Sequence, residues 1–184
     1  MRKVEVKDIE KELMYLMENK IEDIIWCVHK QPLAFKSKLS QIDEEYCKKE
    51  GILICNSFNF GGTIVVDEGD VNLAVTRHKG WDMGNEILQM MLNKFSSRVS
   101  DLSVDNNDLL YQGKYKLVSF ASINVGDDFI YSCWNLTLNP NIERINRVCT
   151  KEMTKIPKSL LDLGITMYDV LSIFQEFDNK RKKS

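Results

Sequence analysis

Paired β-prone runs that alternate with amphipathic helices are the feature of this sequence that most restricts its fold. The clearest pairs are residues 63–66 with 71–75, and residues 109–111 with 115–123. Residues 83–95 lie between the two pairs and carry apolar side chains at helical spacing. Alternation of this kind is typical of α/β proteins of the α+β type. We therefore predict a mixed, largely antiparallel sheet with helices packed on it.

Turn residues connect the two strands of each pair. Asp-Glu-Gly-Asp at residues 67–70 joins the first pair, and Gln-Gly-Lys around Gly113 joins the second. Glycine supplies a positive φ and acidic residues begin turns, so each pair is predicted to form a hairpin. We expect both hairpins to lie in one sheet, with the helix at residues 83–95 packed against it.

The remaining elements follow from the same periodicities. Ser40, with Asp43 three residues later, is predicted to cap a helix that ends at Gly51. Further strands are predicted at residues 24–28, 52–55 and 129–138, and further helices at residues 8–20, 142–148, 158–163 and 166–177.

The chain as a whole suits one domain, predicted over residues 1–178, followed by a basic and disordered tail at 179–184. A net charge of −2 gives no electrostatic reason to expect nucleic acid or a membrane as a partner. No apolar run approaches the roughly 20 residues of a membrane helix. The N-terminus lacks an apolar signal core, so a cytoplasmic protein is expected.

The five cysteines are scattered and form no CxxC pair. Their odd number and spacing fit neither a disulfide framework nor a zinc site, so free thiols are expected. The two histidines, His29 and His78, have no partner at a spacing that suits a metal or a catalytic triad. Both are interpreted as ordinary surface or packing residues.

Two segments can carry chemistry, and the first is the glycine pair Gly61-Gly62 that enters a predicted strand. Glycine has no Cβ, so a ligand can lie against the bare backbone there. The structural alternative is a tight turn or a bulge, which the segment by itself favours.

The second segment contains Asn107-Asp108 before one strand and Lys114 and Lys116 around the start of the next. ATP-dependent acyl transfer needs a carboxylate for Mg²⁺ and a cation for charge that develops on the carboxylate and phosphate groups. Asp108 and Lys116 can supply these groups from neighbouring strands. The structural alternative is an exposed hairpin with a cross-strand ion pair.

Taken in order, these segments resemble the catalytic domain of the lipoate-protein ligase and biotin-protein ligase family. The resemblance covers residues 24–166. The family has a Gly-Gly strand that ends near His-Asp-x-Gly-Asn, then Asn-Asp-Leu, a strand with an essential lysine, and a strand that ends in Leu-Asn. The corresponding segments here are residues 61–72, 107–109 with 113–116, 136–139, and a closing segment at 163–166.

The resemblance implies an enzyme that activates a lipoyl-type acid with ATP and Mg²⁺ and transfers it to a lysine of a lipoyl-type carrier domain. By the same resemblance, Lys116 would be catalytic and would contact the acyl carbonyl and the adenylate. Asp108 would hold the metal. The substrate-binding set would be Gly61, Gly62, Asn107, Lys114 and Ser119.

Three features of the sequence depart from the family pattern. Asn56 and Ser57 stand where two arginines usually precede the glycines, and neither can grip a phosphate with two parallel hydrogen bonds. Val66 stands where the family has histidine. A bulkier side chain, in the segment that contains Phe120, replaces a small glycine and is expected to narrow a ligand tunnel.

The departures leave two alternatives open beside the ligase. The chain can be a catalytically inactive ligase-fold module that binds a protein partner or an acyl ligand. It can also be an ATP-independent octanoyl or lipoyl transferase with a cysteine nucleophile. Cys149 follows the Leu-Asn strand and Cys133 lies within it, although a buried, inert thiol is the favoured interpretation of each.

Overall fold

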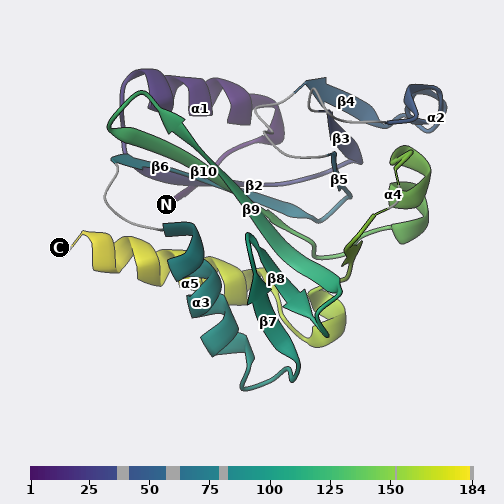
Figure 1. The fold of residues 1–184 in the computed structure, drawn as a ribbon. Helices are drawn as coiled ribbons and strands as arrows, with labels where there is room; N and C mark the ends of the chain where they lie inside the picture. The colour runs from purple at the N-terminus through teal and green to yellow at the C-terminus, as the bar shows by residue number, and fades with distance from the viewer. Residues whose placement is uncertain (37–41, 57–62, 79–82, 152, 183–184) are drawn as a thin grey trace.

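The computed structural model describes residues 1–36, 42–56, 63–78, 83–151 and 153–182, and it forms two sheets with helices around them (Figure 1). The larger sheet is, in spatial order, β1 (Arg2–Lys3), β2 (Asp23–Val28), β6 (Val71–His78), β10 (Phe129–Leu136), β9 (Tyr115–Val125), β8 (Asp108–Tyr111) and β7 (Leu102–Asp105), with β11 (Ile156–Pro157) paired to β9. The smaller sheet is β4 (Leu53–Asn56), β3 (Leu33–Lys36) and β5 (Ile64–Val66).

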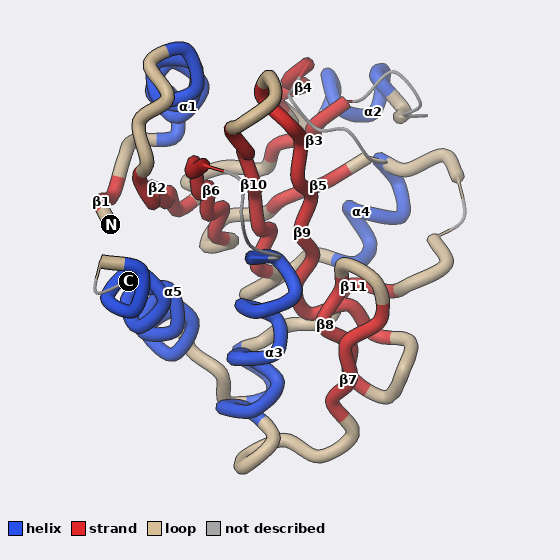
Figure 2. The backbone as a smooth tube through the Cα atoms, turned by 60° about the vertical axis from the view of Figure 1, so that its left-hand side comes forward, coloured by secondary structure: helices blue, strands red, loops and turns tan. Residues whose placement is uncertain are grey.

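Helices cover both faces of the larger sheet (Figure 2). One face carries η1 (Val6–Asp8) and α1 (Ile9–Glu18), and the other carries α3 (Met83–Phe95) and α5 (Met167–Arg181). The short helices α2 (Glu44–Lys49) and α4 (Ile142–Val148) pack with the smaller sheet, and η2 (Leu161–Leu163) precedes α5. None of the helices in the described ranges is long and apolar enough to cross a membrane.

Strand β10 contributes side chains to both faces of the larger sheet. Trp134 and Leu136 belong to the core beneath α3 and α5, whereas Tyr131 and Cys133 pack on the α1 side. Successive side chains point to opposite faces of a strand, so this division follows directly from the alternation. We call these the α3 face and the α1 face below.

The main core lies on the α3 face, around Trp134. Its ring meets Phe174 of α5 edge-on at 5.2 Å and stacks on Phe120 at 5.7 Å between centroids. A Cβ at Gly84 would lie 2.1 Å from the Phe120 ring, so glycine is required there for α3 to approach β9. Phe120 therefore fills space beneath α3 and not on the α1 face, which corrects the expectation that its bulk narrows a ligand tunnel.

Several predicted elements are confirmed. The mixed, largely antiparallel sheet with packed helices is present. The helices at 83–95 and 142–148 begin and end as predicted, and β8 and β9 form the second hairpin with Gly113 at positive φ in its turn. Each of these elements is set by local periodicity and turn chemistry.

The first predicted hairpin is wrong. β5 pairs with β3 in the smaller sheet, whereas β6 pairs with β2 and β10 in the larger one, so the two runs lie in separate sheets. The turn at residues 67–70 forms as predicted, with the Asp70 amide donating to the Asp67 carbonyl over 3.1 Å. Its buried carboxylates bind a distant segment, described below, and the chain crosses there from one sheet to the other.

Smaller differences have local causes. The predicted cap Ser40 lies outside the described residues, and the helix begins at Glu44 because Asp43 accepts a hydrogen bond from the Tyr46 amide over 2.8 Å. Strand β3, just after Pro32, was not predicted. Residues 158–163 form only the single turn η2, and α5 continues to Arg181, three residues into the segment predicted to be a disordered tail.

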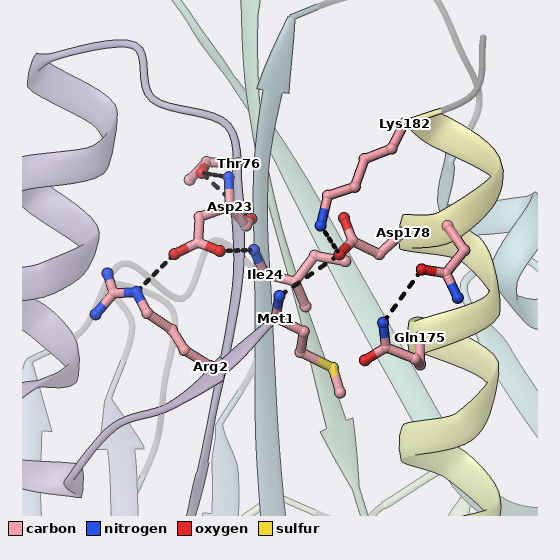
Figure 3. Close-up of polar contacts among 9 residues, drawn as sticks. Met1, Arg2, Asp23, Ile24, Thr76, Gln175, Asp178 and Lys182 are labelled. Carbon is pink, nitrogen blue, oxygen red and sulfur yellow. Dashed lines mark hydrogen bonds and ion pairs between the residues drawn. The ribbon is translucent and has the colours of Figure 1, made fainter.

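The edge strand β1 is fastened to the molecule by ionic contacts (Figure 3). Asp23 accepts from Arg2 Nε over 2.6 Å and from the amide of Ile24 over 2.7 Å. The buried carboxylate of Asp178 in α5 lies 3.5 Å from the amino group of Met1 and 2.8 Å from Lys182 Nζ. The start of the chain is thereby held against the last helix.

The first residues of α5 generate a stability prediction. Thr166 and Asp169 form a reciprocal capping box, and Arg98 Nη2 donates to Asp169 over 2.8 Å. The pairing with Arg98 lowers the pKa of Asp169 from its usual 3.8 to about 2. A carboxylate with a lowered pKa stabilises the fold above its unfolded pKa, and this contribution is lost as pH falls towards 2.

We expect Asp169→Asn to lower the free energy of unfolding by about 1 kcal/mol at neutral pH. The difference from the unchanged protein should shrink as pH falls below about 4. Urea unfolding at several pH values measures both effects, with Asp162→Asn in the exposed turn of η2 as the control. A difference that persists at the lowest pH would contradict the assigned role.

Candidate active site

Two buried carboxylates organise the junction between the sheets. Asp67 is 3% exposed and Asp70 is 1% exposed. Asp70 accepts hydrogen bonds from the amides of Leu138 (2.8 Å), Asn139 (3.1 Å) and Asp67 (3.0 Å). Burial raises the pKa of Asp70, and these amide donors act against that rise. The Leu-Asn segment after β10 is thus fixed to the turn that precedes β6.

Asp67 extends the same junction to α4. Its carboxylate accepts from the Asn141 amide over 2.7 Å and forms an ion pair with Arg144. Gly69, at φ +94°, allows the turn, and its amide donates to the His29 carbonyl over 2.9 Å. The carbonyl of Asp70 in turn accepts from the His29 amide over 2.9 Å. The turn therefore also fixes the residue that follows β2.

A cluster of two carboxylates and two lysines lies at the β7–β8–β9 end of the sheet. Asp108 Oδ1 is 3.2 Å from Lys116 Nζ, and Asp108 Oδ2 is 2.9 Å from Lys155 Nζ. Lys155 is also 2.8 Å from Asp105. Asp108 pairs with Lys116 across β8 and β9, which is the cross-strand ion pair that the structural alternative predicted, and each carboxylate is held by an ammonium group.

Lys155 was not identified from the sequence. It directly precedes β11, which pairs in parallel with the start of β9, Pro157 opposite Lys116. Burial opposes the charged form of Lys155, but its hydrogen bonds to Asp105 and Asp108 outweigh this and raise its pKa. No periodic pattern surrounds residue 155, and the pairing that places it spans some forty residues of chain, so local sequence carried no signal.

A row of polar residues crosses the larger sheet on the α1 face. Register places Cys27 opposite Asn72, Asn72 opposite Asn135, Asn135 opposite Ser119, and Ser119 opposite Asp108. Residues opposite one another share a face, so the five side chains follow one line across the sheet. Asn72 Nδ2 donates to Asn135 Oδ1 over 3.3 Å. The line ends at the carboxylate–lysine cluster.

The other end of this row enters a cavity of about 620 Å³ between α1, the larger sheet and the smaller sheet. The size is in the range of small-molecule sites. Its wall is mostly apolar. Its polar residues are His29, Asn72 and Gln31, together with the charged Glu5, Lys7, Glu10 and Lys30. Other wall residues include Leu13, Cys27, Leu33, Phe35, Ala74 and Cys133.

The thiols near these features are poor nucleophiles. Burial raises the pKa of Cys27 to about 11 and also raises the pKa of Cys133 and of Cys149. A thiol needs a lowered pKa to be nucleophilic at neutral pH. Physical chemistry therefore weighs against the transferase alternative that uses Cys133 or Cys149 as they stand.

The predicted site residues are distributed as follows. Asp108, Lys116 and Ser119 are brought together on the α1 face. Asn107 is in the β7–β8 turn, and its carbonyl accepts from the Phe120 amide over 2.9 Å. Lys114 is exposed in the next turn, with its Nζ 4.7 Å from the Tyr115 ring centroid. Gly61 and Gly62 lie outside the described residues.

The carboxylates around Asp108 decide whether a metal ion fits there. Within the described ranges, no group of three His, Cys, Asp or Glu side chains is arranged to hold a metal ion. Asp105 and Asp108, which share Lys155, are nevertheless a pair of carboxylates on adjacent strands. Mg²⁺ is commonly bound by one or two carboxylates together with substrate phosphates and water. Asp105 and Asp108 therefore fit a metal ion whose remaining ligands would be substrate phosphates and water.

Sequence comparison alone assigns no relatives, because neither a protein-family profile nor a curated protein sequence matches the chain. Solved structures do match. LipL1 of P. falciparum in complex with lipoate gives a TM-score of 0.78 at 15% identity, covering 98% of this chain and 61% of that one. This chain therefore spans less than two thirds of the length of LipL1.

Two further structures extend the likeness. A bi-partite lipoate protein ligase from Thermoplasma acidophilum, described with its E2 lipoyl domain, gives 0.69 at 14% identity, covering 95% and 80% of the two chains. Lipoate-protein ligase A bound with ATP gives 0.68 at 14% identity, covering 93% and 79%. The fold is that of lipoate- and biotin-protein ligases.

The charged cluster yields a chemical prediction. In Asp108→Asn, Lys155 loses one of the two carboxylates that raise its pKa while its burial remains, so its pKa should fall. The free amine fraction at neutral pH rises accordingly, and Lys155 should be acylated faster by an amine-directed reagent. Peptide mass spectrometry measures the rate, and Asp127→Asn in the exposed β9–β10 turn should leave it unchanged. An unaltered rate in Asp108→Asn would refute the pairing.

Proposed function

We propose that this chain activates a lipoyl-type carboxylic acid with ATP and transfers the acyl group to a lysine of a lipoyl-type carrier domain. The observation that carries the proposal is the polar row on the α1 face. It joins an apolar cavity suited to an acyl chain to a cluster suited to a phosphate and a metal. The fold supports the same conclusion, since matching structures hold lipoate or ATP.

Each part of the row has a distinct task in this proposal. The cavity holds the acyl chain, and Ser119 and Asn135, which pair with each other between the cavity and the cluster, would lie beside the reacting carboxylate. Lys116 contacts the acyl carbonyl and the adenylate phosphate, where it stabilises charge that develops in the transition state. Lys155 is a second cation at the same place, an addition to the set expected from sequence.

The ion pairs in the cluster supply a way to couple metal and nucleotide binding. Asp105 and Asp108 would hold Mg²⁺, which supplies positive charge beside the phosphates when bound. With the carboxylates on a metal ion, the ammonium groups of Lys116 and Lys155 would be released from their ion pairs and could bind phosphate oxygens. Two lysines would in this way take over part of the task of the arginines that Asn56 and Ser57 replace.

A binding module without catalysis is the second candidate, and the charge balance of the cluster favours it. Two carboxylates neutralise two lysines there, which leaves no net positive charge for a phosphate. In that case the cavity binds the acid, and ATP is neither bound nor cleaved.

Pyrophosphate release distinguishes the two candidates. We expect release from ATP in the presence of Mg²⁺ with at least one of lipoate, octanoate or biotin. Lys116→Ala should lower the rate by about 100- to 1,000-fold, as for other groups that act on transition-state charge. Lys180→Ala, which removes an exposed lysine of α5, is the matched control. Acid binding without any pyrophosphate release would identify the binding module, and the absence of both would refute the two candidates together.

The replaced arginines generate a prediction about ATP. Lysines are point charges and cannot grip a phosphate with a planar pair of hydrogen bonds, so ATP should bind weakly and lose affinity steeply with added salt. Calorimetry at two ionic strengths measures this. Replacing Asn56 and Ser57 together with arginine should strengthen ATP binding. Tight binding by the unchanged protein at physiological salt would contradict this account of the departures.

A further inference from the structure

His29 is a buried polar side chain in the wall of the cavity, and the proposed function gives it no task. It directly follows β2 and lies two residues after Cys27, so it faces the same side of the sheet. The residue is 2% exposed. Its backbone is held on both sides by the 67–70 turn, and its ring meets Phe35 of the smaller sheet edge-on at 6.1 Å. The ring is therefore fixed in position.

The hydrogen bonds of Asn72 determine which ring nitrogen of His29 carries the proton. Asn72 Nδ2 donates to Asn135 Oδ1 over 3.3 Å and to the Trp134 carbonyl over 3.5 Å. Asn72 Oδ1 consequently accepts, and its partner is Nε2 of His29. A neutral imidazole that donates through Nε2 has an unprotonated Nδ1, which can only accept a hydrogen bond.

Nδ1 of His29 is buried and has no hydrogen-bond partner among the described residues. An acceptor left in this state is costly, by an amount comparable with a lost hydrogen bond. Burial lowers the pKa of His29, which keeps the ring neutral and Nδ1 an acceptor at neutral pH. The side chain thus holds an unpaired acceptor in the wall of a mostly apolar cavity, and Nδ1 has almost no accessible surface. A ligand group would reach it only after the side chains that cover it shift.

We propose that the cavity selects a medium-chain carboxylic acid that carries a hydrogen-bond donor, a hydroxyl or an N–H group, and that this donor binds Nδ1 of His29. The inference rests on the proposed function, which places an acyl chain in the cavity. Strands β6 and β10 separate β2 from β9, so the backbones that carry His29 and Lys116 are roughly 14 Å apart at about 4.8 Å per strand. His29 lies at one end of this interval, in the cavity wall, whereas Lys116 is paired with Asp108 of β8, on the far side of β9. Lys116 would have to turn from that ion pair for one ligand to place its donor at His29 and its carboxylate at Lys116.

Matched acids test the selection. We expect ω-hydroxyoctanoate or biotin, which carry an O–H and N–H donors respectively, to bind about 10-fold or more tightly than octanoate, which has none beyond its carboxyl group. A preference for only one of the two identifies the donor group that the site accepts. His29→Phe should abolish the preference, whereas His78→Phe, at an exposed histidine, should retain it. Equal affinity for octanoate, or a preference that survives in His29→Phe, would overturn the proposal.

A second measurement needs no variant. The chain has only two histidines, so histidine-selective nitrogen NMR gives separate signals for His29 and His78. The Nδ1 signal of His29 should shift when a donor-bearing acid is added and stay in place with octanoate, while His78 is unaffected. A Nδ1 signal that does not respond to an acid shown to bind would overturn the proposal even if His29→Phe failed to fold.

The outcomes separate this inference from the proposed function. Pyrophosphate release with no preference among the acids overturns the selection by His29 and leaves the ligase in place. A donor preference without pyrophosphate release supports His29 and removes the ligase. If none of the acids binds, both proposals are overturned.

Discussion

The arrangement of the site depends on one buried turn. Asp67 and Asp70 are carboxylates with almost no exposure, and their charge is tolerated because backbone amides and Arg144 bind them. The same four-residue turn joins the two sheets, fixes the Leu-Asn segment after β10 and holds both backbone hydrogen-bonding groups of His29. The turn therefore fixes the His29 part of the cavity wall relative to the end of β10 and the start of α4.

The α1 face of the larger sheet carries one row of polar side chains among apolar ones. Cys27, Asn72, Asn135, Ser119 and Asp108 align because strand register leaves no freedom once one face is buried. A one-residue slip of β6 or β10 would turn these side chains into the α3-face core around Trp134 and unpair them there. Packing beneath α3, where Gly84 admits the Phe120 ring, therefore preserves the site on the opposite face.

In the carboxylate–lysine cluster, the positive charges are neutralised by carboxylates of the protein. This differs from an anion site whose lysines or arginines have no acidic partner. Asp108 contacts two lysines, and Lys155 contacts two carboxylates. Lys116, Lys155 and Asp108 are partly buried, whereas Asp105 is exposed. Under the proposed function, a metal ion would replace a lysine beside these carboxylates and change the charge offered to a ligand. The cavity, by comparison, is uncharged at His29, where burial disfavours the imidazolium form.

The sequence by itself determined the elements that local periodicity encodes, such as α3, α4 and the β8–β9 hairpin, and the ordered segments that resemble the ligase family. It also placed Asp108 beside Lys116, because a hairpin brings nearby residues together. Only the tertiary structure separated β5 from β6, added Lys155 to the cluster and turned His29 from an unremarkable histidine into part of a cavity wall. The reason is distance along the chain: Asp70 binds Leu138, 68 residues away, and no local pattern records which remote amide a buried carboxylate will find.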